Sequence, residues 1–287
     1  MIEPHMKQLE GDAVYINAAI YDGGKKAVLC LHGITANCRS WDMIAQALIP
    51  EYTVIALDLR GRGASDKPAS GYSSDHHIRD IIGVMDALGI DRVHLMGHSL
   101  GAFISLVFAA EHPERVEKLV LMDGGGNLGQ QQLNHVFEAI RPALDRLGKI
   151  FDSRQAYINH MKSNPSLQPW MPHIETYYHH EIQKGPTGFT TNINPVHIQE
   201  EAENVGKIDC NALYGRIKCP TLILRASRGL LSQKDLLLPE DVVDQMTSNI
   251  ANVQRFDVKG INHYGIVFAP HKDRDNVLLF FLSGKRR

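Results

Sequence analysis

The stretch RVHLMGHSLGAFISLVFAA, residues 92–110, determines how the rest of the chain is interpreted. A short apolar run comes before the pentapeptide GHSLG (97–101), and a long apolar segment comes after it. This pattern predicts a buried strand, a tight turn and a helix. A serine in such a turn occupies a strained backbone corner with its hydroxyl above the sheet, and small neighbours let strand and helix approach closely. Ser99 is therefore a candidate nucleophile.

Strand-like apolar runs alternate with helix-like segments from Lys26 to Met122. This alternation predicts a parallel sheet covered by helices on both faces. Together with the GHSLG turn, it resembles the α/β-hydrolase fold, and the similarity covers nearly all of the chain except its middle segment. The resemblance implies a mostly parallel sheet flanked by helices, an inserted helical cap, and a catalytic triad in the order serine, acid, histidine.

Length and composition favour one large enzyme domain with an insertion. The chain has 287 residues, of which 44% are hydrophobic, so it can bury a sizeable core. Its net charge of −2 gives no electrostatic argument for binding nucleic acid or an anionic membrane. No apolar run approaches the ~20 residues of a membrane span, and the N-terminus lacks the apolar core of a signal peptide. A cytoplasmic protein with reduced cysteines is expected.

The division into domains is predicted from where the strand-helix alternation stops. Residues 1–127 and 215–287 are expected to form the hydrolase core, and residues 128–214 a helical cap. Prolines and aromatic residues accumulate in the cap segment. Large apolar side chains there are candidates to line an apolar pocket: Phe137, Phe151, Tyr157, Trp170, Met171, Tyr177, Tyr178 and Phe189.

The buried run KAVLCL ends in His32-Gly33-Ile34-Thr35. In the family that this sequence resembles, a His-Gly pair at this place builds half of an oxyanion hole. The two donors would be the backbone N–H groups of Ile34 and Leu100, which stabilise charge on a carbonyl oxygen under attack. The residues expected to touch substrate are His32, Gly33, His98, Trp170 and Tyr264.

The triad base is expected at His263, within Asn262-His263-Tyr264, a string that resembles esterase and lactonase members of the family. The position of the triad acid is not given by the usual pattern. The loop where the family usually carries the acid reads RASRGL (225–230) and has no carboxylate. Asp123, at the end of the strand that follows the nucleophile's helix, is the predicted acid. Asp235 and Asp241 are the alternatives and are expected to be helix caps or first-turn residues.

Two sequence features suggest other kinds of site. Gly124, Gly126 and Gly129 match Gly-x-Gly-x-x-Gly, which favours dinucleotide binding in another context, but they occur late in the sheet. A tight turn out of the sheet is the preferred interpretation. The histidines of the middle segment lack metal-ligand spacing, so no metal is expected.

The sequence thus predicts a serine hydrolase that acts on small carboxylic esters (a carboxylesterase) or on lactones. No cofactor is expected. Amide and carbon-carbon bond hydrolases share the triad and remain open alternatives. A hydrolase-fold ligand receptor with weak turnover is an alternative of another class, and a dinucleotide oxidoreductase is a more distant one. The oligomeric state is left open.

Overall fold

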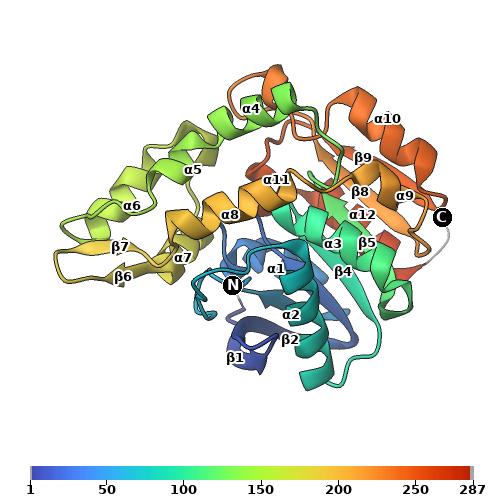
Figure 1. The fold of residues 1–287 in the computed structure, drawn as a ribbon, viewed down its shortest axis with the longest axis horizontal. Helices are drawn as coiled ribbons and strands as arrows, with labels where there is room; N and C mark the ends of the chain where they lie inside the picture. The colour runs from blue at the N-terminus through green and yellow to red at the C-terminus, as the bar shows by residue number, and fades with distance from the viewer. Residues whose placement is uncertain (1, 285–287) are drawn as a thin grey trace.

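A computed structural model describes residues 2–284, in which a central sheet lies between two layers of helices (Figure 1). The strand order is β1-β2-β4-β5-β8-β9, and β3 also pairs with β2. All neighbouring pairs from β2 to β9 along this path are parallel, and β1 is antiparallel to β2. The strands are β1 (His5–Glu10), β2 (Tyr15–Leu31), β3 (Tyr52–Leu57), β4 (Val93–His98), β5 (Val116–Met122), β8 (Thr221–Ala226) and β9 (Val253–Val258). The predicted α/β fold class is confirmed.

The first part of the sheet differs from the prediction. Two separate segments, Ala13 to Ile20 and Lys26 to Leu31, were expected, whereas the structure has one long bent strand, β2, with several register irregularities. Both halves of β2 pair with β3, so that Ala18 and Leu31 each lie opposite Leu57. The bend brings the β2 backbone very close to the chain before β3. A Cβ on Gly24 would lie 2.0 Å from the carbonyl oxygen of Glu51, which explains the glycine there.

Side chains of the strands alternate between the two faces of the sheet. Leu29 and Leu31 face one core cluster, whereas Val28 and Cys30 face the other. The first cluster is covered by α2 (Ser74–Ala87), α3 (Leu100–Glu111) and α10 (Glu240–Asn249). The second is covered by α1 (Asp42–Leu48), α11 (Gly265–Phe268) and α12 (Lys272–Ser283). Burial on both faces is why these strands are continuously apolar.

A mainly helical segment is inserted between β5 and β8, and part of it extends away from the sheet (Figure 1). Its elements are α4 (Gln130–Ala139), α5 (Arg141–Asp145), α6 (Arg154–Lys162), α7 (Pro172–Glu181), β6 (Ile182–Lys184), β7 (Phe189–Thr191), α8 (Pro195–Val205) and α9 (Cys210–Tyr214). We call residues 128–214 the cap segment. Its last helix, α9, already packs in the core cluster with α3 through Cys210, Leu213 and Tyr214.

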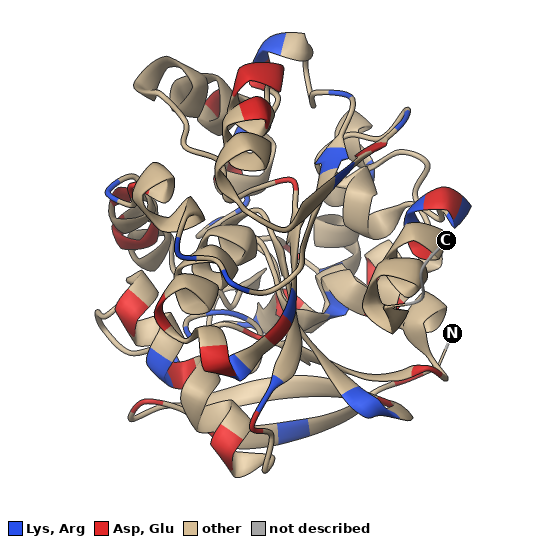
Figure 2. Cartoon of the chain, turned by 90° about the vertical axis from the view of Figure 1, so that its right-hand side faces the viewer, with Lys and Arg blue, Asp and Glu red and all other residues tan. Residues whose placement is uncertain are grey.

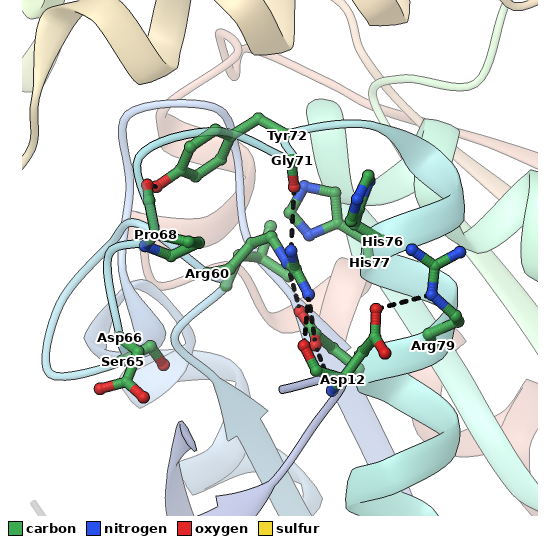
Figure 3. A network of polar contacts seen from close by, with 12 residues as sticks. Asp12, Arg60, Ser65, Asp66, Pro68, Gly71, Tyr72, His76, His77 and Arg79 are labelled. Carbon is green, nitrogen blue, oxygen red and sulfur yellow. Dashed lines mark hydrogen bonds and ion pairs between the residues drawn. The ribbon is translucent and has the colours of Figure 1, made fainter. Parts of the chain in front are cut away.

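The loop after β3 is held by a buried polar network (Figure 3). Arg60 makes a two-pronged ion pair with Asp80 of α2, at 2.7 and 2.8 Å, and donates to the carbonyl oxygen of Gly71 at 3.0 Å. Next to it, Arg62 and His77 both contact the buried carboxylate of Glu201 on α8. This loop therefore has a structural role, and it anchors the cap segment to the core.

Figure 2 shows acidic and basic residues interspersed on helices and loops in that view. Within residues 2–284, none of the helices combines the length and the hydropathy that crossing a bilayer requires.

Candidate active site

Ser99 occupies a sharp corner between β4 and α3. Its backbone has φ 55° and ψ −120°, a left-handed conformation that is strained for a residue with a side chain. Such strain costs on the order of 1–3 kcal/mol and persists only where the surroundings enforce it. Here the Ser99 N–H donates to the carbonyl oxygen of Met122 on the neighbouring strand at 3.1 Å. The predicted strand-turn-helix is confirmed as local structure.

The glycines on either side of the corner allow three backbones to meet. A Cβ on Gly97 would lie 2.1 Å from the carbonyl oxygen of Gly101, and a Cβ on Gly101 would lie 2.0 Å from that of Leu31. Neither position accepts even an alanine without a backbone shift. The close packing holds α3 directly behind Ser99.

His263 and Asp123 are 140 positions apart in the sequence and form a buried pair. His263 Nδ1 lies 2.8 Å from Asp123 Oδ2, and both side chains are nearly inaccessible. The other carboxylate oxygen, Oδ1, accepts from the backbone N–H of Ala226 at 3.0 Å. Asp123 itself has φ 47° and directly follows β5, at the carboxyl end of that strand. The carboxylate therefore fixes which nitrogen of His263 carries the proton, and Nε2 is left for chemistry.

The two alternative acids lie elsewhere. Asp235 is buried, and its carboxylate accepts from the backbone N–H groups of Leu230, Leu231 and Ser232 at 2.6, 2.9 and 2.7 Å. Asp241 is exposed in the first turn of α10. Both are thus capping or first-turn residues, and Asp235 additionally shapes the loop after β8.

His98 supports His263 from behind. The two rings are 4.5 Å apart, and His98 Nε2 lies 3.0 Å from the carbonyl oxygen of His263. Because that oxygen only accepts, Nε2 of His98 carries the proton. Burial, and then the neighbouring His263, hold the pKa of His98 well below its usual value, so it stays neutral. A neutral ring next to His263 avoids repulsion when His263 becomes protonated.

Ser99 and His263 face one small cavity of about 60 Å³. Three of the five residues predicted to touch substrate, Gly33, His98 and Tyr264, line it. Sequence reasoning missed most of the other lining residues, which come from the cap segment and from the chain after His263. The missed residues include Val136, Ile140, Ala143, Arg146, Val267 and Phe268.

The predicted pocket roles of His32 and Trp170 are not supported by their positions, because neither side chain lines the cavity. His32 is fully buried, with Nδ1 2.7 Å from the Gly33 carbonyl oxygen and Nε2 accepting from the Leu59 N–H at 3.0 Å. Burial lowers the pKa of His32 to about 4, so it is a neutral brace for the loop. Trp170 instead stacks on Tyr178, with ring centroids 5.7 Å apart.

Of the aromatic and methionine side chains predicted for an apolar pocket, Tyr177 and Tyr178 line the cavity. Of the others, Met171 lines a larger neighbouring cleft, whereas Phe151, Tyr157, Trp170 and Phe189 pack in or against the second core cluster. Tyr157, for example, is fully buried and donates to Glu181. A partial signal for the missed residues was the spacing of Val136, Ile140 and Ala143, which are four and three positions apart. In the structure these residues span the junction between α4 and α5.

The two predicted oxyanion donors are adjacent to this cavity. Leu100 is the first residue of α3, where a backbone N–H has no partner within the helix. Ile34 lines the cavity in the turn after β2. Neither N–H donates a hydrogen bond to another group within residues 2–284. Both are thus available to a bound oxygen atom, and their role remains a prediction.

Arg146 is the one cationic side chain in the cavity lining, and its charge is already compensated. Its Nε and Nη2 pair with the two carboxylate oxygens of Glu181 at 2.8 and 2.9 Å. Nη2 also donates to the carbonyl oxygen of Thr35 at 2.7 Å, next to Ile34. Burial alone would lower the pKa of Arg146, but the Glu181 charge raises it well above the usual value. The cavity is therefore close to neutral.

A buried Cys–Asp–His cluster joins the cap segment to the core outside this cavity. The ligand atoms of Cys38, Asp58 and His180 lie within 4.8 Å of one another, a grouping that could hold a metal ion. However, the Asp58 carboxylate already accepts from Asn17 Nδ2 and from the backbone N–H groups of Cys38 and Ala64, and it contacts His180 Nε2. Three of these contacts are to Oδ2 and one is to Oδ1, and they link the cap segment to the core as a structural tie.

The Gly-x-Gly-x-x-Gly match is used for packing. A Cβ on Gly124 would lie 2.6 Å from the carbonyl oxygen of Ser99, and one on Gly126 would lie 2.4 Å from the Val242 side chain. The two glycines let the chain pass under the nucleophile corner and α10. That use does not require a dinucleotide phosphate, whose usual place is the first strand-helix unit.

Comparisons with known proteins agree with the fold. A model of the alpha/beta hydrolase fold family matches residues 26–170. An uncharacterized protein of Mycobacterium tuberculosis is 38% identical over 104 residues, 36% of this chain and 30% of its own length. The 2-hydroxy-6-oxononadienedioate/2-hydroxy-6-oxononatrienedioate hydrolase of Klebsiella pneumoniae is 28% identical over 84% of this chain and 82% of its own. The chain thus spans less than a third of the length of the first relatives it matches.

Solved structures show the same fold at low identity. An E-2-(acetamidomethylene)succinate hydrolase aligns with a TM-score of 0.79 and 23% identity, covering 98% of this chain and 99% of the other. The enol-lactonase of Burkholderia xenovorans aligns with a TM-score of 0.72 and 17% identity, covering 96% and 100%. At these identities the likeness supports a shared architecture.

Proposed function

Because the chain belongs to the alpha/beta hydrolase fold family, we propose that it is a serine hydrolase that cleaves small carboxylic esters through an acyl-enzyme. The observation that carries the proposal is the buried His263–Asp123 pair, since His263 and the strained Ser99 line one cavity. A nucleophile, a base and a group that orients the base are the parts that acyl transfer needs.

In the proposed reaction, Ser99 Oγ attacks the ester carbonyl while His263 Nε2 takes its proton. The N–H groups of Ile34 and Leu100 stabilise the oxyanion, and Asp123 stabilises the imidazolium. His263 then protonates the leaving alcohol, which departs and leaves an acyl-Ser99. Water, activated by His263, hydrolyses this intermediate and releases the acid. Each step uses only side chains and backbone of this chain, so the reaction needs no cofactor or metal.

The size and charge of the cavity favour a small, uncharged acyl group. Its volume of about 60 Å³ is well below the ~300–1,000 Å³ of ordinary ligand sites. Val136, Ile140 and Ala143 give it an apolar wall. Arg146, its one cation, is neutralised by Glu181 and is not free to bind a carboxylate.

Carbon-carbon bond hydrolysis is the second candidate. The Klebsiella pneumoniae relative has the name of such a hydrolase, and its match covers most of both chains. A dioate substrate, as in that name, carries two carboxylates. The charge balance of the Arg146–Glu181 pair argues against holding one of them in the small cavity. Lactones and amides are further candidates, since a lactone is a cyclic ester and an amide is attacked in the same way.

The test is a panel of 4-nitrophenyl esters of increasing acyl length, run beside lactones, anilides and a dienedioate ketone. The wild type is expected to turn over the acetate ester, and Ser99→Ala is expected to abolish this activity. Activity confined to the dienedioate would replace the proposal with the second candidate, and equal turnover by Ser99→Ala would reject the nucleophile.

Pre-steady-state kinetics separate an enzyme from a ligand receptor of the same fold. An enzyme is expected to turn over many times after any initial burst of 4-nitrophenol. A single burst of one equivalent, followed by release too slow to measure, would instead indicate a receptor that is acylated by its ligand.

A further inference from the structure

A second and larger cleft adjoins the catalytic cavity. Its volume is about 610 Å³, compared with about 60 Å³ for the cavity. Tyr264 and Phe268 line both spaces, and Tyr264 directly follows the proposed base His263. These two aromatic side chains therefore lie between the cleft and the cavity that holds the reacting groups. A volume of this size is typical of sites for small molecules.

The cleft has a mixed lining, in which polar residues such as Asn164, Ser166 and Gln168 lie beside apolar side chains from two parts of the chain. Leu167, Met171 and Ile174 belong to the cap segment. Leu230, Leu231 and Ile261 belong to the loops after β8 and β9. Leu231 is 69% exposed, so its apolar surface is free to cover a ligand. Apolar walls on both sides suit a hydrocarbon chain or ring.

Arg228 supplies the one charge among the residues that line the cleft. It is exposed and forms no ion pair with any group in residues 2–284, unlike Arg146 in the small cavity. Its backbone is fixed, because the Arg228 N–H donates to the carbonyl oxygen of Ile261 at 3.0 Å. Asp235 also holds the next part of the same loop through the N–H groups of Leu230 and Leu231.

Arg228 lies in the RASRGL segment, whose Ala226 N–H donates to Asp123, but the Arg228 side chain is not part of the His263–Asp123 pair. An unpaired guanidinium beside an apolar cleft is suited to a planar carboxylate, which it binds through two parallel hydrogen bonds. The proposed function determines which end of the substrate lies near the cleft, because His263 must protonate the leaving oxygen. The leaving group therefore lies on the side of His263 and Tyr264, where the cleft begins.

We propose that the cleft binds the leaving-group side of the substrate, an apolar alcohol that ends in a carboxylate, and that Arg228 binds this carboxylate. The substrate would then combine a small neutral acyl group with a larger anionic alcohol. This inference rests on the proposed ester hydrolysis for its orientation only. Binding of the free alcohol to the cleft is independent of turnover.

The first experiment measures binding without chemistry. Calorimetric titration of the full chain with 6-hydroxyhexanoate and with 1,6-hexanediol compares an anionic and a neutral alcohol of equal length. The hydroxy acid is expected to bind about fivefold to tenfold more tightly, as one partly exposed ion pair allows. Arg228→Gln is expected to remove this preference and Arg228→Lys to keep part of it. Arg216→Gln, an exposed arginine outside both cavities, serves as the matched control and keeps the full preference.

The second experiment compares kcat/KM for 6-acetoxyhexanoate and 6-acetoxyhexanamide. The ratio is expected to favour the anion in the wild type and to fall to near one in Arg228→Gln. Equal binding of both alcohols, or a preference that survives in Arg228→Gln, overturns the inference. If the binding preference holds but neither ester is cleaved, the anion site stands and the proposed function fails. If both esters are cleaved at equal rates and the alcohols bind equally, the site fails alone.

Discussion

His263 Nδ1 lies 2.8 Å from Asp123 Oδ2, and Asp123 Oδ1 accepts from the Ala226 N–H at 3.0 Å. One carboxylate thereby joins β5, the end of β8 and the loop after β9. In the family that the sequence resembles, the acid usually stands in the loop after β8. Here the end of β8 contributes the backbone N–H of Ala226 to this contact. The orientation of the proposed base thus depends on a residue from the strand next to the nucleophile's own.

Asp123→Asn is expected to lower kcat on 4-nitrophenyl acetate by about a thousandfold to ten-thousandfold, a scale taken from the equivalent change in a serine protease. An amide has an N–H where His263 needs an acceptor, so the proton position on the ring is no longer controlled. Thermal unfolding of the variant checks that the fold is kept.

The control is Asp241→Asn, which changes an exposed first-turn carboxylate of α10 and is expected to keep full activity. Asp235→Asn is a poorer control than the sequence suggested, because three backbone N–H groups depend on that carboxylate. Loss of activity in Asp241→Asn together with an active Asp123→Asn would reject the assignment.

The contact between His180 of α7 and Asp58 after β3 predicts a pH-dependent tie between cap segment and core. The atoms Nε2 and Oδ2 are 2.8 Å apart, and the His180 side chain is 16% exposed. Burial alone would lower the pKa of His180, but the hydrogen bond and charge of Asp58 outweigh it and raise the pKa. Burial likewise opposes ionisation of Asp58, yet His180 and two backbone N–H groups hold its pKa far below the usual value.

A raised histidine pKa stabilises the fold below the unfolded value of about 6.5, and this contribution is lost as pH rises through the higher folded value. His180→Gln is therefore expected to lower the free energy of unfolding by about 1–3 kcal/mol near pH 6, and by less above pH 8. Urea unfolding across this range is the measurement. His179→Gln, on the exposed side of the same helix, is the control. A loss that is equal at all pH values would show that His180 acts only by packing.

The size of the small cavity is expected to limit acyl length. Ile140 lines it where α4 gives way to α5, so Ile140→Ala is expected to raise kcat/KM for butyrate and hexanoate esters relative to acetate. Trp170 lies behind Tyr178 and does not touch the cavity, so Trp170→Ala should change this preference less. Steady-state kinetics on the ester series decide between them. A larger shift in Trp170→Ala would mean that Tyr178 moves when its stacking partner is removed.

The predictable parts of the site are those that depend on residues close together in the sequence. The Ser99 turn follows from local sequence, because only small residues fit at Gly97 and Gly101. Asp123 could be chosen because the RASRGL loop lacks a carboxylate and a triad needs one.

The remaining parts depend on which helix lies over which strand. Trp170 was predicted to line the pocket by residue type alone, whereas the packing of α7 turns it toward Tyr178. Arg146 carries no sequence motif, and its role appears only when Glu181 and Thr35 are brought to it. The long bend of β2 was missed because its two halves have separate apolar patterns.

The buried Arg146–Glu181 pair leads to a final prediction about both stability and catalysis. Its two hydrogen bonds of 2.8 and 2.9 Å link α7 to the chain after α5, and both side chains are almost fully buried. Removal of one partner leaves a buried charge unpaired, which typically costs about 3–5 kcal/mol, whereas replacing both with apolar groups is often near neutral. Arg146→Met and Glu181→Met are thus each expected to be destabilising, and the double variant is expected to be more stable than either.

Catalysis distinguishes Arg146 from Glu181. Of the two, Arg146 donates to the Thr35 carbonyl oxygen, at 2.7 Å, which also accepts from the Tyr177 hydroxyl at 3.4 Å. Arg146 thus makes the shorter of the two contacts to the turn that presents the Ile34 N–H. The double variant is therefore expected to recover stability but not turnover, with kcat lowered about tenfold or more on every acyl length, because a displaced oxyanion donor acts on the transition state. Urea unfolding and kcat across the ester series provide the two measurements. Full recovery of kcat in the double variant would show that the pair serves stability alone and that the Ile34 turn holds its shape without Arg146.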